Sequence, residues 1–240
     1  MKKFIACVLL VGCGGDDSGG GNGTVPLDDL GMELAITSCA QQFDCCTDAE
    51  IMAQYMGISY DGHPISTEAE CVEFSNALLT GLLVAEYKES LAAGRIEYDG
   101  AAAADCVAAL GALTCTQYSA GLNDDLQIAC GPFVIPKVGD GGACGEDYEC
   151  TSGYCVGEKE GADGAPDIDG TCMPVPTMGQ TCTDDCASGL YCVFDQSGMK
   201  TCQPLKADGT QCNLDSECTS DYCDDTAHTC GGRALVCDGR

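Results

Sequence analysis

Cysteine is the residue type that decides most of the chemistry open to this sequence, because 22 of the 240 residues are cysteine. Two cysteines separated by two residues would favour a zinc site or thiol exchange, but the sequence contains no such pair. The two histidines, His63 and His228, lie far apart in the sequence and add no ligand set. We therefore expect structural disulfides, and we expect no metal and no cofactor.

Cys13 is expected to have a different chemistry, because it follows two lysines, an apolar stretch over residues 4–11 and Gly12. This order resembles a bacterial lipoprotein signal, in which the cysteine receives lipid and becomes the first residue of the mature protein. A helix over 4–11 reaches only about 12 Å at ~1.5 Å per residue, too short for a hydrocarbon core of about 30 Å. Residues 1–12 are therefore predicted to be a cleaved signal peptide. The alternative is an ordinary secretory signal that happens to contain a cysteine.

The number of remaining cysteines is even once Cys7 is cleaved off and Cys13 carries lipid. In an exported chain, the twenty that remain predict up to ten disulfides. Seven precede Gly131, and the thirteen that follow form three groups of four plus Cys237, so both halves hold an odd number. We predict one bridge from Cys237 to the first half; the alternative is a free Cys237 that cross-links to another chain. The expected disulfide cysteines are Cys39, Cys45, Cys46, Cys71, Cys106, Cys115, Cys130, Cys144, Cys150, Cys155, Cys172, Cys182, Cys186, Cys192, Cys202, Cys212, Cys218, Cys223, Cys230 and Cys237.

The rest of the sequence gives little evidence for a catalytic site or a calcium site. Residues 163–170 combine aspartates with glycines, but they lack the third ligand position and the closing glutamate of a calcium loop, so a solvated hairpin tip is the favoured interpretation. The aspartate pairs at 184–185 and 224–225 are expected to be exposed. Serine or cysteine catalysis would need a histidine, and His63 and His228 both have the sequence surroundings of surface residues. We therefore predict no catalytic residues and no enzyme.

The elements that position these cysteines differ between the two halves of the chain. Residues 13–27 form a glycine-rich tether, and residues 28–135 form a cysteine-bearing helical domain. Thr47 to Glu50 and Thr67 to Glu70 are capping boxes that begin two of its helices. The expected helices begin near Asp28 and cover 47–55, 67–94 and 101–113, with a short helix or turn within 116–130 and a loop over 58–65.

Helix geometry limits the pairing in the first half. Cys39 and Cys46 lie two turns apart, about 10.5 Å along a helix axis, whereas a disulfide needs Cα atoms within about 7 Å. They should each connect to another segment. Cys45 and Cys46 point about 100° apart on a helix, so a bridge between them is not expected. Cys106 and Cys115 can join only if the helix ends between them.

A repeat replaces the helical pattern over residues 136–240. Its modules cover about 139–176, 177–205 and 207–240, each with four cysteines. Modules 1 and 3 share the phrase Glu-Cys-Thr-Ser-x-Tyr-Cys, whereas module 2 has a shorter first spacing. Modules this small cannot hold an apolar core, so disulfides must replace it. The predicted fold class is α plus small disulfide-rich, with a disulfide-linked helical bundle followed by three cysteine modules with short hairpins.

The cysteine spacing of these modules resembles the small disulfide modules of the Dickkopf amino-terminal and colipase type. Spacing alone permits three connectivities in each module. The resemblance implies pairing of the first cysteine with the third and of the second with the fourth. The whole layout, with a lipobox, a helical domain and such modules, resembles surface lipoproteins common in myxobacteria and their relatives. In the animal relatives the modules bind other proteins, which implies binding by analogy.

The net charge and the expected membrane attachment together limit the possible functions. A formal net charge of −28 repels nucleic acid, so nucleic acid is not an expected partner. The lipid on Cys13 would attach the protein to a membrane of the cell envelope, and we expect this to be the outer membrane. We predict a lipid-anchored surface protein with a binding or structural role and a protein partner at the cell surface. The alternatives are an inhibitor of a secreted protease and an envelope enzyme with an unrecognised site.

Overall fold

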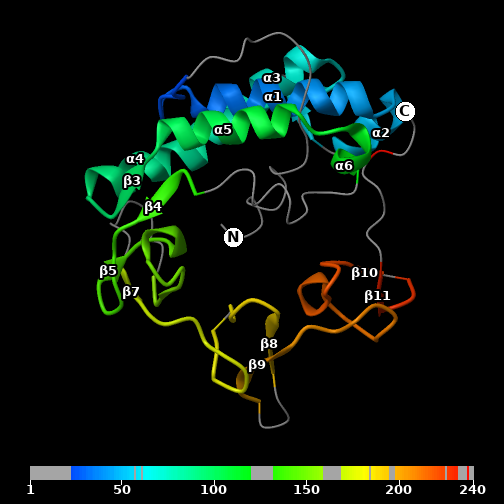
Figure 1. The fold of residues 1–240 in the computed structure, drawn as a ribbon. Helices are drawn as coiled ribbons and strands as arrows, with labels where there is room; N and C mark the ends of the chain where they lie inside the picture. The colour runs from blue at the N-terminus through cyan, green and yellow to red at the C-terminus, as the bar shows by residue number, and fades with distance from the viewer. Residues whose placement is uncertain are drawn as a thin grey trace. The chain divides into compact units, whose positions relative to one another are not determined.

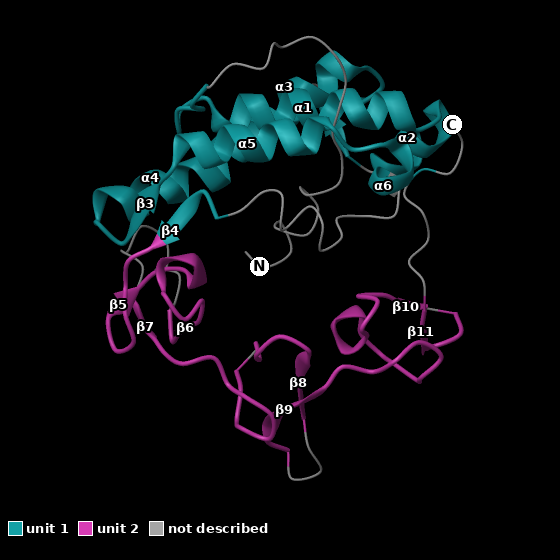
Figure 2. Cartoon of the chain, in the orientation of Figure 1, with its two compact units in different colours: residues 1–135, 235–240 teal, residues 136–234 magenta. Residues whose placement is uncertain are grey.

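The computed structural model shows helices and small antiparallel sheets (Figure 1). With its many disulfides the chain has a small disulfide-rich α plus β fold. The chain divides into two compact units, which we call unit 1 (residues 1–135 and 235–240) and unit 2 (residues 136–234) (Figure 2). Among the residues described, no helix has the length and apolar character needed to cross a membrane. The structure describes residues 23–56, 58–60, 62–119, 132–158, 169–183, 185–194, 198–224, 226–231 and 237.

Helix α1 (Leu30–Cys45) is the central element of unit 1 and packs against α3 (Glu68–Leu79) and α5 (Gly100–Gly111). Its buried residues include Ala35 and Cys39, which recur at helical spacing on one face. Small side chains on this face let neighbouring helices approach closely. Disulfides from the same helix then add covalent links to the packing.

Both predicted capping boxes are present. Before α2 (Asp48–Gln54), the Thr47 backbone N–H donates to Glu50 Oε2 at 2.6 Å, and the Glu50 N–H donates to Thr47 Oγ1 at 3.4 Å. Thr67 and Glu70 repeat the exchange before α3, at 3.1 and 3.3 Å. These boxes explain why both helices begin where a threonine is followed by glutamate three residues later.

The helix predicted over 67–94 is a continuous run made of three parts. After α3 follows a π-helical turn, η2 (Thr80–Val84), and then α4 (Ala85–Ala92). The π turn shifts the register of the later residues, and Val84 is fully buried. Helix α6 (Cys115–Ser119) begins the predicted 116–130 segment, but residues 120–131 lie outside the described part of the chain.

Two small sheets occur in unit 1 where the sequence predicted none. Strands β1 (Ser59–Tyr60) and β2 (His63–Pro64) form a hairpin within the segment expected to be a loop. Strand β3 (Ile96–Tyr98) pairs with β4 (Val134–Pro136). The predicted loop over 58–65 is therefore wrong where it contains the β1–β2 hairpin, and the predicted helical domain also contains strands, because strands of two or three residues leave no alternating pattern long enough to detect.

The last residues of the predicted tether pack on unit 1. The Val25 N–H donates to the Gly100 carbonyl oxygen at 2.9 Å, and the Tyr98 hydroxyl donates to the Val25 carbonyl oxygen at 2.8 Å. Val25 and Leu27 also contact the apolar cluster that contains Leu30. Residues 23–27 thus behave as part of the folded unit, because two apolar side chains there outweigh the glycine-rich composition before them.

Unit 2 consists of short strands and turns around disulfides. In modules 1 and 3 the buried clusters are the four cysteines themselves, and in module 1 Val138 packs against them. The sulfur atoms therefore form the core, as expected for modules too small to bury an apolar one. The elements are β5 (Ala143–Cys144), η3 (Asp147–Glu149), β6 (Cys155–Val156), β7 (Gly170–Cys172), β8 (Leu190–Phe194), β9 (Lys200–Pro204), η4 (Asp215–Glu217), β10 (Cys223–Asp224) and β11 (Thr229–Cys230), with β5, β7 and β6 in one sheet and β8–β9 and β10–β11 as hairpins.

Candidate functional site

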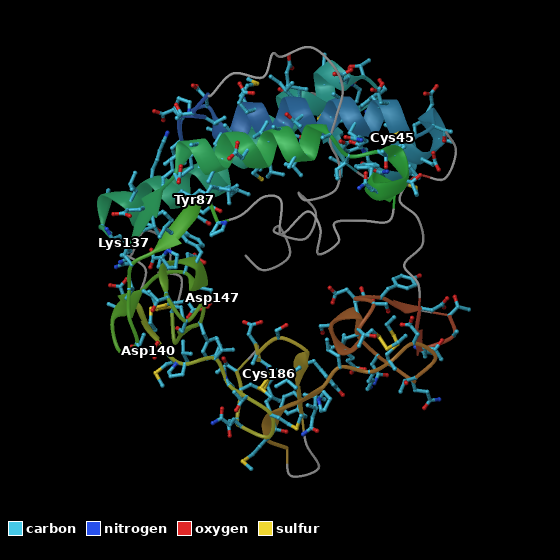
Figure 3. The ribbon with its side chains drawn as sticks, in the orientation of Figure 1. Cys45, Tyr87, Lys137, Asp140, Asp147 and Cys186 are labelled. Atoms are coloured by element: carbon cyan, nitrogen blue, oxygen red, sulfur yellow. A yellow bond between two sulfur atoms is a disulfide. The ribbon has the colours of Figure 1, made fainter. Side chains whose placement is uncertain are left out.

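All three modules share one disulfide connectivity, in which the first cysteine pairs with the third and the second with the fourth. This is the pairing that the resemblance implied, and Figure 3 shows the bridges as yellow bonds, including that of Cys186. Crossed pairs of this kind connect both ends of each short loop to the same core. The bridges are Cys144–Cys155, Cys150–Cys172, Cys182–Cys192, Cys186–Cys202, Cys212–Cys223 and Cys218–Cys230.

The crossed bridges also bring sulfur atoms close enough to resemble metal clusters. In each module three cysteine sulfurs lie within 4.8 Å of one another. Each of these sulfurs is already oxidised in a bridge, whereas zinc binds the thiolate. The proximity is therefore a consequence of two adjacent disulfides.

The cysteines of unit 1 connect helices to distant segments. Cys46 pairs with Cys237, which is the bridge that the odd cysteine counts predicted. Cys106 is also disulfide-bonded. Cys7, Cys13 and Cys130 lie outside the described residues, and so does the predicted lipidation. The other bridges of unit 1 between described residues are Cys39–Cys71 and Cys45–Cys115.

A buried glutamate shapes the first loop of modules 1 and 3. Glu149 is 2% exposed, and its Oε2 accepts the Gly145 N–H at 2.6 Å. Glu217 is 4% exposed, and its Oε2 accepts the Asn213 N–H at 3.0 Å. The two glutamates occupy the same place in the repeated phrase. Sequence reasoning missed this role because glutamate is ordinarily an exposed residue, and only its recurrence in the phrase could have signalled it.

Two aspartates complete the same loops. Asp147 Oδ1 accepts the Cys155 N–H at 2.6 Å, and Asp215 Oδ1 accepts the Cys223 N–H at 2.7 Å (Figure 3 labels Asp147). In module 2 the first spacing is two residues shorter, so the loop that carries these acids in the other modules is shortened. The acids therefore serve local structure in modules 1 and 3.

A tyrosine connects module 1 to module 2. Tyr154, which directly precedes the third cysteine of module 1, is 5% exposed. Its hydroxyl lies 2.7 Å from Thr183 Oγ1, and the Thr183 N–H donates to it at 3.4 Å. Because Thr183 follows the first cysteine of module 2, this contact fixes one module against the next.

The equivalent tyrosine of module 2 contacts module 3. Lys206 Nζ lies 5.7 Å from the centroid of the Tyr191 ring and 2.6 Å from Glu217 Oε2. The hydrogen bond to Glu217 raises the pKa of Lys206, against the opposing effect of desolvation. A charged lysine therefore joins the aromatic ring of one module to the buried carboxylate of the following one.

Large apolar side chains remain exposed on unit 2. In the β8–β9 hairpin, Cys192 and Cys202 are cross-strand partners, and both are bridged. Beyond them Phe194 is 66% exposed and Met199 56% exposed, and Lys200 Nζ lies 5.6 Å from the Phe194 ring centroid. Among the described residues of the modules, the other exposed large apolar side chains are Met173, Met178 and Leu214.

The acidic and histidine candidates have local partners. Asp224 Oδ1 accepts the N–H groups of Thr226 and Ala227 at 2.8 and 2.7 Å, which lower the pKa of its carboxyl group. His63 Nδ1 lies 3.8 Å from Glu70 Oε1 on the surface. Of the remaining acidic candidates, residues 163–168, Asp184 and Asp225 lie outside the described residues.

Two of the hollows in the described parts of the chain bear on catalysis. One of about 400 Å³ in module 3 is lined by Lys206, His228, Gln211 and Asn213 with Cys212. The other, of about 170 Å³ in unit 1, is mainly apolar, and no carboxylate belongs to its described lining. Convergent carboxylates, which would favour an enzyme, are thus not found in that lining.

Comparison of this chain with protein-family models, with curated proteins and with solved structures finds no match.

Proposed function

We propose that this chain is an exported cell-envelope protein, attached to the outer membrane through lipid on Cys13, that binds a protein partner through unit 2. The observation that carries the proposal is the β8–β9 hairpin, whose Phe194 and Met199 are exposed just beyond two bridged cysteines. The N-terminal signal and the twenty remaining cysteines support export, because disulfides form outside the reducing cytoplasm.

Preorganisation supports a binding role. Association loses free energy when loops and side chains must be ordered, and a bridged hairpin has already lost much of that freedom. Aromatic residues dominate the energy of many interfaces, and methionine adapts its shape to a partner. The bridged β8–β9 hairpin is therefore a fixed support, and the exposed side chains of Phe194 and Met199 offer an adaptable apolar contact.

Contacts between neighbouring modules also limit the freedom of the module array. Tyr154 holds module 1 against Thr183, and Tyr191 with Lys206 holds module 2 against module 3. A partner can then contact more than one module without ordering the array first. The formal net charge of −28 favours a partner with basic residues around an apolar patch, because complementary charge raises association rates.

The test is site-specific photo-crosslinking on living cells. A photo-reactive residue at Phe194 should yield a defined cross-linked protein, whereas the same residue at Met56, 80% exposed in unit 1, should not. The paired substitution of Phe194→Asp and Met199→Asp should abolish cross-linking from a probe at Met178. Equal cross-linking from Phe194 and Met56 would contradict binding through the hairpin.

A second candidate, inhibition of a secreted protease, is favoured by the same loop. Cys192 and Cys202 are cross-strand partners in the β8–β9 hairpin and both are bridged, a constraint expected of a segment that resists cleavage while bound in an active site. Purified protein should then inhibit a serine protease with a stoichiometry of about one, and Lys200→Ala or Phe194→Ala should raise the inhibition constant at least tenfold. Cross-linking to a protein without protease activity would favour the first candidate.

A further inference from the structure

We infer that the Cys46–Cys237 bridge keeps the module array attached to the anchored helical unit after the chain has been cut between modules. Release of the array then requires both a cut and a thiol reductant. The inference extends the proposed function, since only an anchored protein has something to retain at the cell surface.

The argument begins with the positions of the bridges along the chain. Cys46 and Cys237 are separated by 191 residues, and both belong to unit 1, whereas residues 136–234 form unit 2. The six bridges of unit 2 each close within one module, over 10 to 22 residues. Unit 2 is therefore joined to unit 1 by the backbone at its first residue and, through Cys237, at its last.

Nine bridges join described residues, and of these nine only Cys46–Cys237 joins the two sides of a cut made in a linker between modules. Here a linker is the segment between the last cysteine of one module and the first cysteine of the next, which gives residues 173–181 and 203–211, and both lie outside every loop that the module bridges close. Thr177 and Met178 in the first linker are exposed, so a protease can reach the backbone there. After one such cut, the C-terminal piece remains covalently held through Cys237.

The bridge itself is protected from thiols. Cys46 is fully buried and Cys237 is 3% exposed, in a cluster with Ile51 and Tyr118. The Gln54 amide lies 3.5 Å from Cys46 Sγ and 3.7 Å from Cys237 Sγ. Exchange needs a thiolate to reach one of these sulfurs, so burial slows it.

The release step is a thiol–disulfide exchange with an external dithiol. A thiolate of the dithiol attacks one sulfur of the Cys46–Cys237 bridge and expels the other as a thiolate, which gains a proton. The second thiol of the reagent then resolves the mixed disulfide. The dithiol ends as a disulfide, while Cys46 and Cys237 gain two electrons and two protons and become thiols.

The experiment inserts a recognition sequence for a site-specific protease between Pro174 and Val175 of the full chain. After cleavage, a denaturing gel without reductant should show one species of uncut mass, and dithiothreitol should convert it into two fragments. In a variant with Cys46→Ser and Cys237→Ser the two fragments should separate without reductant. A matched control with Cys182→Ser and Cys192→Ser removes a bridge that does not span the cut and should still show one species.

Separation of the cut parent chain without reductant would overturn the inference, whether or not the serine variants fold. The same cut is then made on intact cells, where the C-terminal fragment should stay with the cells until dithiothreitol is added. If the purified chain stays joined but both fragments leave the cells without reductant, the anchor proposal fails and the bridge inference stands.

Discussion

Lys206 Nζ lies 2.6 Å from Glu217 Oε2, and this ion pair connects the entrance of module 3 to its first loop. Lys206 is paired in parallel with Cys218, as Val138 is with Cys150 in module 1. The same backbone arrangement therefore carries an apolar side chain in one module and a lysine in the other. The lysine adds a contact between modules, because Lys206 also reaches the ring of Tyr191 in the preceding module.

Lys206→Met should loosen the junction between modules 2 and 3. The substitution keeps the aliphatic stem but leaves Glu217, which is 4% exposed, without its cation. Removing one partner of a fully buried ion pair costs about 3–5 kcal/mol. The cost here is smaller than that range because the Lys206 side chain is 25% exposed and the pair is partly screened by solvent. Hydrogen exchange of the Asn213 amide, which donates to the same carboxylate, should become at least tenfold faster.

Lys200→Met is the matched control for that substitution. Lys200 Nζ donates to the exposed Thr183 carbonyl oxygen at 2.6 Å, so its loss leaves no buried charge. Exchange at Asn213 should be unchanged in this variant. Equal protection in both variants would show that the ion pair does not hold the loop.

Two glycines of unit 1 should respond in opposite directions to substitution by alanine. A Cβ at Gly100 would lie 2.8 Å from the Val25 carbonyl oxygen, whereas a Cβ at Gly81 would meet nothing within 4 Å. Gly100→Ala should therefore destabilise unit 1 by about 1–3 kcal/mol through overpacking. Gly81→Ala should stabilise it by about 0.5–1 kcal/mol, because alanine loses less backbone entropy in a helix.

Urea unfolding followed by far-ultraviolet circular dichroism measures both glycine variants. The Gly100→Ala variant should also expose the 23–27 segment to proteolysis, since Val25 would have to move away from α5. Similar unfolding midpoints for the two variants would show that the 23–27 segment can move away from α5 without loss of stability.

Tyr87 predicts a loss of stability at alkaline pH. Burial raises the pKa of its hydroxyl to about 12, with smaller contributions from Glu86 and Tyr98. The unfolded chain loses this proton near pH 10, so between about pH 10 and about pH 12 the folded state binds one more proton. The contribution is fully present below about pH 10 and falls above it by at most about 1.4 kcal/mol per pH unit, which over the two units to about pH 12 sets an upper limit of about 2.7 kcal/mol.

Tyr87→Phe removes the titrating group while it keeps the ring, whose centroid lies 6.5 Å from that of Phe133. Brief urea unfolding at pH 9 and at pH 11 should show a smaller decrease in stability for the variant than for the parent chain. Short exposure limits alkaline damage to the disulfides. An identical decrease in both proteins would assign the alkaline transition to other groups.

Local patterns explain which parts of the fold were predictable. Thr47 and Thr67 each sit three residues before a glutamate, so both capping boxes could be read within four residues. The pairing of β3 with β4 joins segments almost forty residues apart, and no local signal identifies it. Cys45 and Cys46 are not bridged to each other, as expected, but the premise that both lie on a helix is wrong for Cys46, which follows the end of α1 in extended backbone. Their partners depend on packing and could not be named from the sequence.

The buried carboxylates show a different limit. Glu149 and Glu217 share a position in a repeated phrase, which was visible in the sequence. Their burial follows from backbone N–H groups that point into a disulfide loop, and this depends on the bridges having formed. The repeat was therefore a signal of shared structure, although the residue type suggested solvent exposure.

Cys13→Ala tests the membrane attachment on which the proposed function depends. If Cys13 carries lipid, metabolic labelling with a radioactive fatty acid should be abolished in the variant. The disulfides should be unaffected, because an even number of cysteines remains without Cys7 and Cys13. Non-reducing peptide mapping should still recover the peptide that joins Cys46 to Cys237. Persistent labelling would show that the lipid is attached at another residue and would contradict the anchor at Cys13.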